Sequence, residues 1–93
     1  MDTYAQIAEK IIERQESIIG PIAIEQASQV SGLTIDWKAH KVSISASDEA
    51  HIIDELVSVY QALFGQISVE VSKEAAHALI TQLKPEQLPS SLR

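Results

Sequence analysis

The sequence has 93 residues, of which 45% are hydrophobic and 22% are charged, and its formal net charge is −6. A chain this short forms one hydrophobic core, and this composition is that of a globular domain rather than a disordered one. The absence of cysteine excludes disulfides, thiolate nucleophiles and zinc–thiolate sites. We therefore expect a single domain that needs no oxidising compartment.

The charge and the hydropathy pattern narrow the classes of partner. The isoelectric point is near 4.8, and the Lys and Arg residues are scattered rather than clustered. Because nucleic-acid binding depends on neutralising phosphates, this pattern argues against nucleic acids and against anionic membrane surfaces. No apolar run approaches the ~20 residues of a membrane span. Asp2 stands where a signal peptide would carry positive charge. We expect a cytoplasmic protein without a membrane partner.

Residues 3–19 have the pattern of an amphipathic helix, because their apolar residues recur at spacings of three, four and seven. The apolar residues of this stripe are Tyr4, Ile7, Ala8, Ile11, Ile12, Ile18 and Ile19. Glu9, Lys10, Glu13, Arg14 and Glu16 cover the other side.

The next segment, IIGPIAI at residues 18–24, is interrupted by Gly20-Pro21. Glycine accepts the left-handed conformation that ends a helix, and proline is favoured at the start of the next one. The segment therefore predicts a corner between two helices, with both sides facing the core. We expect the second helix to be short and to close at Ser31-Gly32.

From Leu33 the apolar period changes to two, which predicts a β-hairpin. The loop of residues 38–41 lacks the Gly or Asn that tight hairpins prefer. The register that places all the apolar residues on one face pairs Trp37 with Val42, Ile35 with Ile44 and Leu33 with Ala46.

Ser47 followed by Asp48-Glu49 predicts a helix start, with a broad apolar stripe from Ile52 to Phe64. Residues 66–72 fit a strand or a helix, because their apolar residues suit both periods. Enrichment in Ala, Lys and Glu at 73–78 favours a helix, either continuous through Gly65 or kinked there, ending at Lys84-Pro85.

These elements predict a helix-rich α+β fold with the order helix, helix, β-hairpin and one long C-terminal helix, continuous or kinked. Residues 1–84 form the single domain in this interpretation, and residues 85–93 form a C-terminal tail that docks loosely or frays.

Chemistry-bearing motifs are weak. Glu74 and His77 have the Glu-x-x-His spacing of carboxylate-bridged metal sites, with Glu70 one turn earlier, and Asp48 and His51 share that spacing. Glu70, Glu74 and His77 lie away from the apolar stripe of the same helix, so we predict a solvated face and no metal or cofactor. No nucleophile elbow, phosphate-binding loop or buried carboxylate pair is present in the sequence, so we expect no enzymatic activity.

The alternative function is a DNA-binding regulator that uses a helix-turn-helix-like segment at residues 22–37. The spacing of Ala27 and Gly32 and the alternation after Gly32 both argue against this alternative.

The main functional hypothesis is a small interaction or regulatory module that forms a homodimer and contacts an unknown protein partner. The C-terminal helix is apolar on two sides, so one side is left over after the core is filled. The predicted self-association surface is Val69, Ala76 and Ile80. Trp37 either packs the hairpin onto the helices or serves as a partner-contact aromatic.

Overall fold

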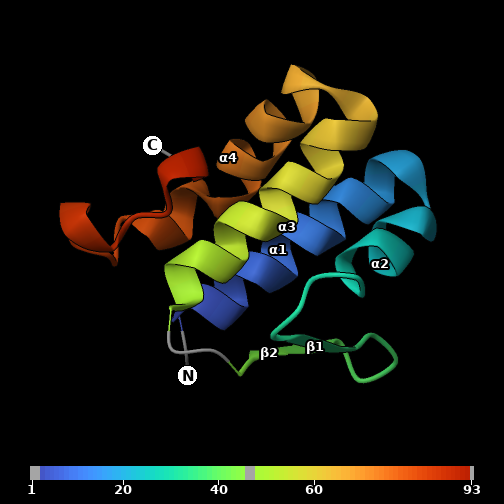
Figure 1. Cartoon of the computed structure of the whole chain (residues 1–93), viewed down its shortest axis with the longest axis horizontal. Coiled ribbons are helices and arrows are strands. Elements are labelled where there is room, and N and C mark those ends of the chain that lie inside the picture. The colour runs from blue at the N-terminus through green and yellow to red at the C-terminus, as the bar shows by residue number, and fades with distance from the viewer. Residues whose placement is uncertain (1–2, 46–47, 93) are drawn as a thin grey trace.

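The computed structural model describes residues 3–45 and 48–92 and shows a helix-rich α+β fold with one antiparallel hairpin (Figure 1). The elements in chain order are α1 (Thr3–Ile19), α2 (Ile22–Ala27), β1 (Leu33–Asp36), β2 (Lys41–Ile44), α3 (Glu49–Phe64), α4 (Gln66–Ile80) and the short 3₁₀ turns η1 (Pro85–Gln87) and η2 (Ser90–Leu92). Within the described ranges, no helix has both the length and the apolarity that a membrane span requires.

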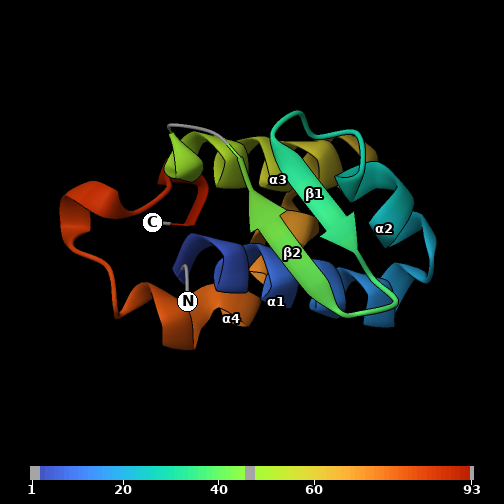
Figure 2. The ribbon, with the colours of Figure 1, turned by 90° about the horizontal axis from the view of Figure 1, so that it is seen from below.

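The elements form layers around α1. The hairpin lies against α1 on one side and α4 packs along it on the other, so α1 is covered from both directions (Figure 2). The buried core is mainly aliphatic and includes Ile7, Ile11, Ile12, Ile53 and Leu56, together with the aromatic Tyr60. The Tyr60 hydroxyl donates to the carbonyl oxygen of Ala23 at 2.7 Å. Burial raises the pKa of Tyr60, so this phenol stays protonated and ties α3 to α2.

The first helix and the corner after it are confirmed. α1 spans the predicted residues 3–19, and Gly20 has a left-handed φ of 79° between α1 and α2. Two details differ. α2 ends at Ala27, before the predicted closure, and Ile18 and Ile22 are exposed rather than facing the core.

The hairpin is confirmed, but its predicted register is wrong. Leu33 pairs with Ile44 and Asp36 pairs with Lys41, which shifts the predicted pairing by two residues. A shift of two preserves the face of every side chain, so the apolar pattern could not distinguish the two registers. The predicted partner Ala46 lies outside the described residues.

The loop of this hairpin comprises residues 37–40. His40 has the positive φ of 55° that a Gly or Asn would otherwise provide. The Asp36 side chain accepts a hydrogen bond from the Ala39 backbone N–H at 3.3 Å. These two features replace the glycine that the loop sequence lacks.

The C-terminal helix, predicted to be continuous or kinked at Gly65, is two helices that Gly65 separates and that fold back on each other (Figure 1). Gly65 has φ 78° and ψ −163°, a conformation that essentially only glycine adopts. The chain reverses there, and α4 packs against both α3 and α1. At the other end of α3, Asp48 caps the helix by accepting from the His51 N–H at 3.1 Å, while Ser47 lies outside the described residues.

The C-terminal segment, residues 85–92, packs on the helices through η2, which contacts α3 and α4. Pro89 and Leu92 are buried. The Tyr4 hydroxyl, at the start of α1, donates to the backbone oxygen of Gln87 at 2.9 Å.

Candidate interaction surface

Two separate stretches of this acidic chain contain no charged residues. Residues 17–24 and residues 56–69 contain no Asp, Glu, Lys or Arg. The first stretch forms the α1–α2 corner, and the second contains the α3–α4 corner. Figure 1 shows both corners at the same end of the molecule, and the C-terminal segment at the opposite end.

The exposed large hydrophobic residues of the described chain all belong to these two stretches. They are Ile18, Ile22, Leu63, Phe64 and Ile67, and Ile67 is the most exposed at 70%. Single exposed aliphatic residues are ordinary, but a group of them at one end of a protein marks an interaction site. We call these five residues the apolar end.

A cleft of about 260 Å³ joins the two corners. Its walls are mainly apolar and its lining residues are Gln15, Ile18, Ile19, Phe64, Ile67, Ser68 and Val71. Gln15 is only 2% exposed, and its Nε2 donates to the Ser68 carbonyl oxygen at 3.2 Å and to Ser72 Oγ at 3.3 Å. The Gln15 amide nitrogen is therefore engaged within the chain, and the walls that the cleft offers to a ligand are mainly apolar.

The predicted self-association residues lie elsewhere than expected. Val69 is 8% exposed and Ala76 is fully buried in the chain's own core, while Ile80 is half-buried. The side of α4 that faces the core thus includes Val69 and Ala76, Ile67 is exposed, and Ala75 and Leu79 are partly buried against the core. The physical reason is the pairing of Gln15 with Ser68 and Ser72, because it turns a serine-bearing face of α4 towards α1. Counting apolar residues alone favoured the face that contains Ile67.

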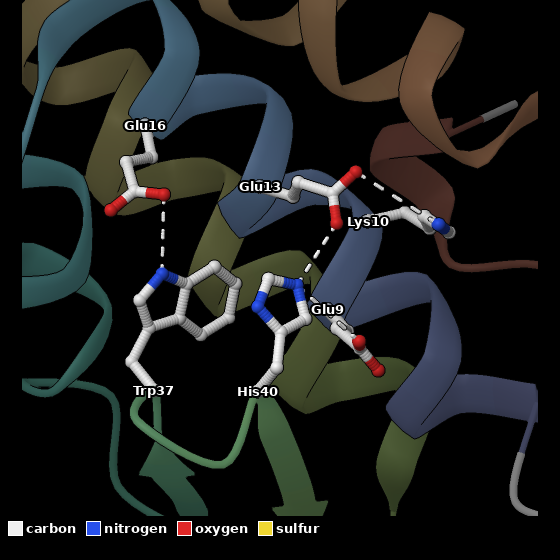
Figure 3. A network of polar contacts seen from close by, with 6 residues as sticks. All are labelled: Glu9, Lys10, Glu13, Glu16, Trp37 and His40. Carbon is white, nitrogen blue, oxygen red and sulfur yellow. Dashed lines mark hydrogen bonds and ion pairs between the residues drawn. The ribbon is translucent and has the colours of Figure 1, made fainter.

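Trp37 lies in the hairpin loop, half-buried, rather than in the strand. Its indole Nε1 donates to Glu16 Oε1 at 3.1 Å (Figure 3), and its ring lies 4.3 Å from the His40 ring between centroids. It belongs to the partly buried residues packed against the core. These contacts attach the hairpin to α1, so the Trp37 indole has its hydrogen-bond and ring partners within the same chain.

His40 extends the same network along α1. Its Nε2 lies 3.0 Å from Glu13 Oε2 and 3.6 Å from Glu9 Oε1, and Lys10 Nζ approaches Glu13 at 3.9 Å (Figure 3). The Lys10, Glu13 and His40 side chains are about half exposed to solvent, and that of Glu9 is less exposed, at 24%. Such exposed pairs contribute little to stability individually, and this network links the hairpin loop to α1.

The residues considered for metal binding do not form a metal cluster. Glu70, Glu74 and His77 line a shallow surface of α4, where Glu70 approaches Lys73 and Glu74 approaches Arg14. His51 pairs with Glu55 along α3 at 3.0 Å. No group of three or more His, Cys, Asp or Glu among residues 3–45 and 48–92 is arranged to hold a metal ion.

The helix-turn-helix-like segment lacks its second helix. α2 is six residues long, and the part of the segment that would supply a recognition helix forms β1. A recognition helix is what reads the major groove in that motif. Residues 22–37 therefore do not have the geometry that the DNA-binding alternative requires.

Asp54 is a polar centre that the sequence interpretation missed. Its Oδ1 accepts from the N–H and hydroxyl of Ser91, and its Oδ2 accepts from the N–H and hydroxyl of Ser90. Burial by itself would raise the pKa of Asp54, but the hydrogen bonds from Ser91 and then Ser90 outweigh it and hold the pKa below its ordinary value. The one local indication in the sequence is the Ser90-Ser91 pair after Pro89. No residue near this pair in the sequence indicates that Asp54 is its partner.

In comparisons with known proteins, the chain matches no protein family, no curated protein and no solved structure. The function is therefore inferred from the residues of the chain itself.

Proposed function

We propose that this protein is a small, non-enzymatic interaction module that self-associates through its apolar end. The observation that carries the proposal is that the five exposed large hydrophobic residues lie on two charge-free corners at one end. Apolar patches with depleted charge are typical of the centres of interfaces. The absence of cysteine agrees with a cytoplasmic location, where thiols are kept reduced and disulfides are rare.

A second copy of the chain is the partner that the charge distribution favours. The net charge of −6 makes two copies repel each other wherever charged faces meet. The apolar end is where two copies can approach without placing like charges together. A basic partner would gain its charge attraction elsewhere on the surface, not at these corners.

A two-fold arrangement fits this surface best. In such an interface the same patch is used by both copies, so a side chain of one copy enters the cleft of the other and the reverse holds too. Phe64 and Ile67 stand at the rim of the cleft and are exposed. We propose that these two side chains are the anchors, because large apolar groups seated in a pocket contribute most to binding.

Analytical ultracentrifugation tests the proposal. We expect the wild-type chain to sediment at twice its 10.2 kDa mass at low micromolar concentration, and Ile67→Glu to sediment as a monomer. Ala78→Glu is the matched control, because it adds the same charge at an exposed position of α4 outside the apolar end. A wild-type chain that remains monomeric at high concentration contradicts the proposal.

A further inference from the structure

A second specific contact surface lies at the end of the molecule opposite the apolar end (Figure 1). We call it the tail site, and define it as Asp54 together with the parts of α3 and α4 against which η2 packs. The C-terminal segment of the same chain occupies it. Pro89 is fully buried there and Leu92 is 3% exposed.

The tail site holds its segment in a way that depends on sequence. Each carboxylate oxygen of Asp54 accepts from one serine, with distances of 3.3 and 3.0 Å from the N and Oγ of Ser90 and 2.9 and 2.6 Å from those of Ser91. The buried Pro89 and Leu92 flank this pair. In the sequence Pro89-Ser90-Ser91-Leu92, the two serines therefore bind the Asp54 carboxylate and the apolar residue on each side of them is buried.

The connection between α4 and this segment is short and mostly exposed. Thr81, Gln82 and Lys84 are exposed, whereas Leu83 is partly buried against the core, and α4 itself ends at Ile80. The contacts at the tail site are local to the segment and do not depend on how the segment is connected to α4. A segment from another chain can form the same bonds to Asp54.

We propose that the tail site is an exchangeable docking site, which the C-terminal segment of a second copy occupies in place of the chain's own. A second copy carries the matching segment, so every hydrogen bond and buried side chain at the site is reproduced between chains. Reciprocal exchange produces a closed two-fold dimer. The chain's own segment competes at an effective concentration of about 1 mM, so exchange rises with protein concentration.

This proposal is independent of self-association through the apolar end, and complementation between two full-length variants tests it. The first variant carries Leu92→Glu, which disables its segment and leaves its Asp54 free. The second carries Asp54→Ala, which disables its site and leaves its segment intact. Both also carry Ile67→Glu, so that the apolar end makes no contribution. Circular dichroism establishes that each variant is folded before mixing.

We expect each variant alone to be monomeric, and an equimolar mixture to form a one-to-one complex below the about 1 mM that exchange in the unmodified chain requires, because neither variant has a working segment and a working site of its own to pair. Adding Asp54→Ala to the first variant removes both the site and the segment from that chain, and the complex must then disappear. A mixture of folded variants that stays monomeric overturns the proposal.

A second experiment covers the case in which either variant fails to fold. A protease site inserted between Thr81 and Gln82 of the otherwise native chain is cut after folding, which converts residues 82–93 into a separate peptide. We expect a fluorescent peptide of that sequence to exchange into the cut protein, and to bind the uncut protein at least 10-fold more weakly because of its own segment. Equal binding to both forms, or binding to neither, overturns the proposal.

Discussion

Asp54 and Ser91 form the closest side-chain hydrogen bond at the C-terminal end of the protein, with 2.6 Å between Oδ1 and Oγ, although the two residues are 37 positions apart. The Ser91 N–H also donates to the same oxygen at 2.9 Å. This pair joins the beginning of α3 to the last turn of the described chain, and its strength depends on the charge of Asp54.

We expect Asp54→Asn to lower the free energy of unfolding at pH 7 by about 1–2 kcal/mol, less than the full value of charged hydrogen bonds because the site is partly exposed. Because the folded-state pKa of Asp54 lies below its ordinary value of 3.8, its stabilisation is present above that value. It is lost as the pH falls through 3.8 to the lowered pKa. Urea titrations at pH 7 and pH 3 should therefore show a large difference between wild type and variant at pH 7 and a smaller one at pH 3. A difference that grows on acidification contradicts the assignment.

The second prediction compares the effects of substitutions at a buried and at an exposed position of α4 on the free energy of unfolding. Val69→Ala should lower the free energy of unfolding by about 2 kcal/mol, from two methyl groups lost from the core and the cavity they leave. Ile67→Ala should change it by less than about 0.5 kcal/mol in the monomer, because Ile67 is 70% exposed. Chemical denaturation in an Ile18→Glu background, which we expect to be monomeric, provides the comparison. The reverse order of effects would restore the face assignment predicted from the sequence.

Gly65 makes a third prediction through its backbone conformation. Gly65→Ala should lower the free energy of unfolding by about 1–3 kcal/mol, because φ 78° with ψ −163° is strained for any residue with a Cβ. Apart from Gly65 and its two chain neighbours, no heavy atom lies within 4 Å of an added Cβ, so contact with the rest of the protein adds nothing to this cost. Thermal denaturation followed by circular dichroism measures it. An unchanged melting temperature would mean that the reversal between α3 and α4 does not require glycine.

Trp37 provides a fourth prediction, on the attachment of the hairpin. Trp37→Ala should cost about 2–3 kcal/mol, below the range for a fully buried aromatic because the indole is half-buried. Trp37→Phe should cost about 1 kcal/mol by removing the hydrogen bond to Glu16. Urea denaturation followed by circular dichroism measures both changes.

Glu16→Gln is the control for this bond, because the amide oxygen still accepts from the indole. Its free energy of unfolding should stay within about 0.5 kcal/mol of wild type, as most surface substitutions do. A loss from Glu16→Gln as large as that from Trp37→Ala would show that charge, rather than the hydrogen bond and packing, attaches the loop.

Local patterns were sufficient for the parts of this fold that depend on neighbours in sequence. The bounds of α1 follow from its 3.6-residue period, and the first corner follows from Gly20-Pro21, since both depend on backbone geometry within a few residues. The alternation from Leu33 onwards determines which hairpin side chains face the helices, whatever the register.

Tertiary contacts determined the remaining features of the fold. At each of them the local sequence is compatible with more than one arrangement, and a contact with a residue far away in sequence favours one of these. The indole of Trp37 reaches Glu16 from the loop, in a hairpin register that the apolar pattern could not distinguish from its neighbour. Gln15 turns the face of Ser68 and Ser72 towards the core, which leaves Ile67 outside and creates the apolar end. Asp54 holds a segment that composition alone marks as a loose tail. In each case a buried or charged polar group requires a specific partner. Such pairings leave no periodic pattern in the sequence, so they cannot be predicted from one.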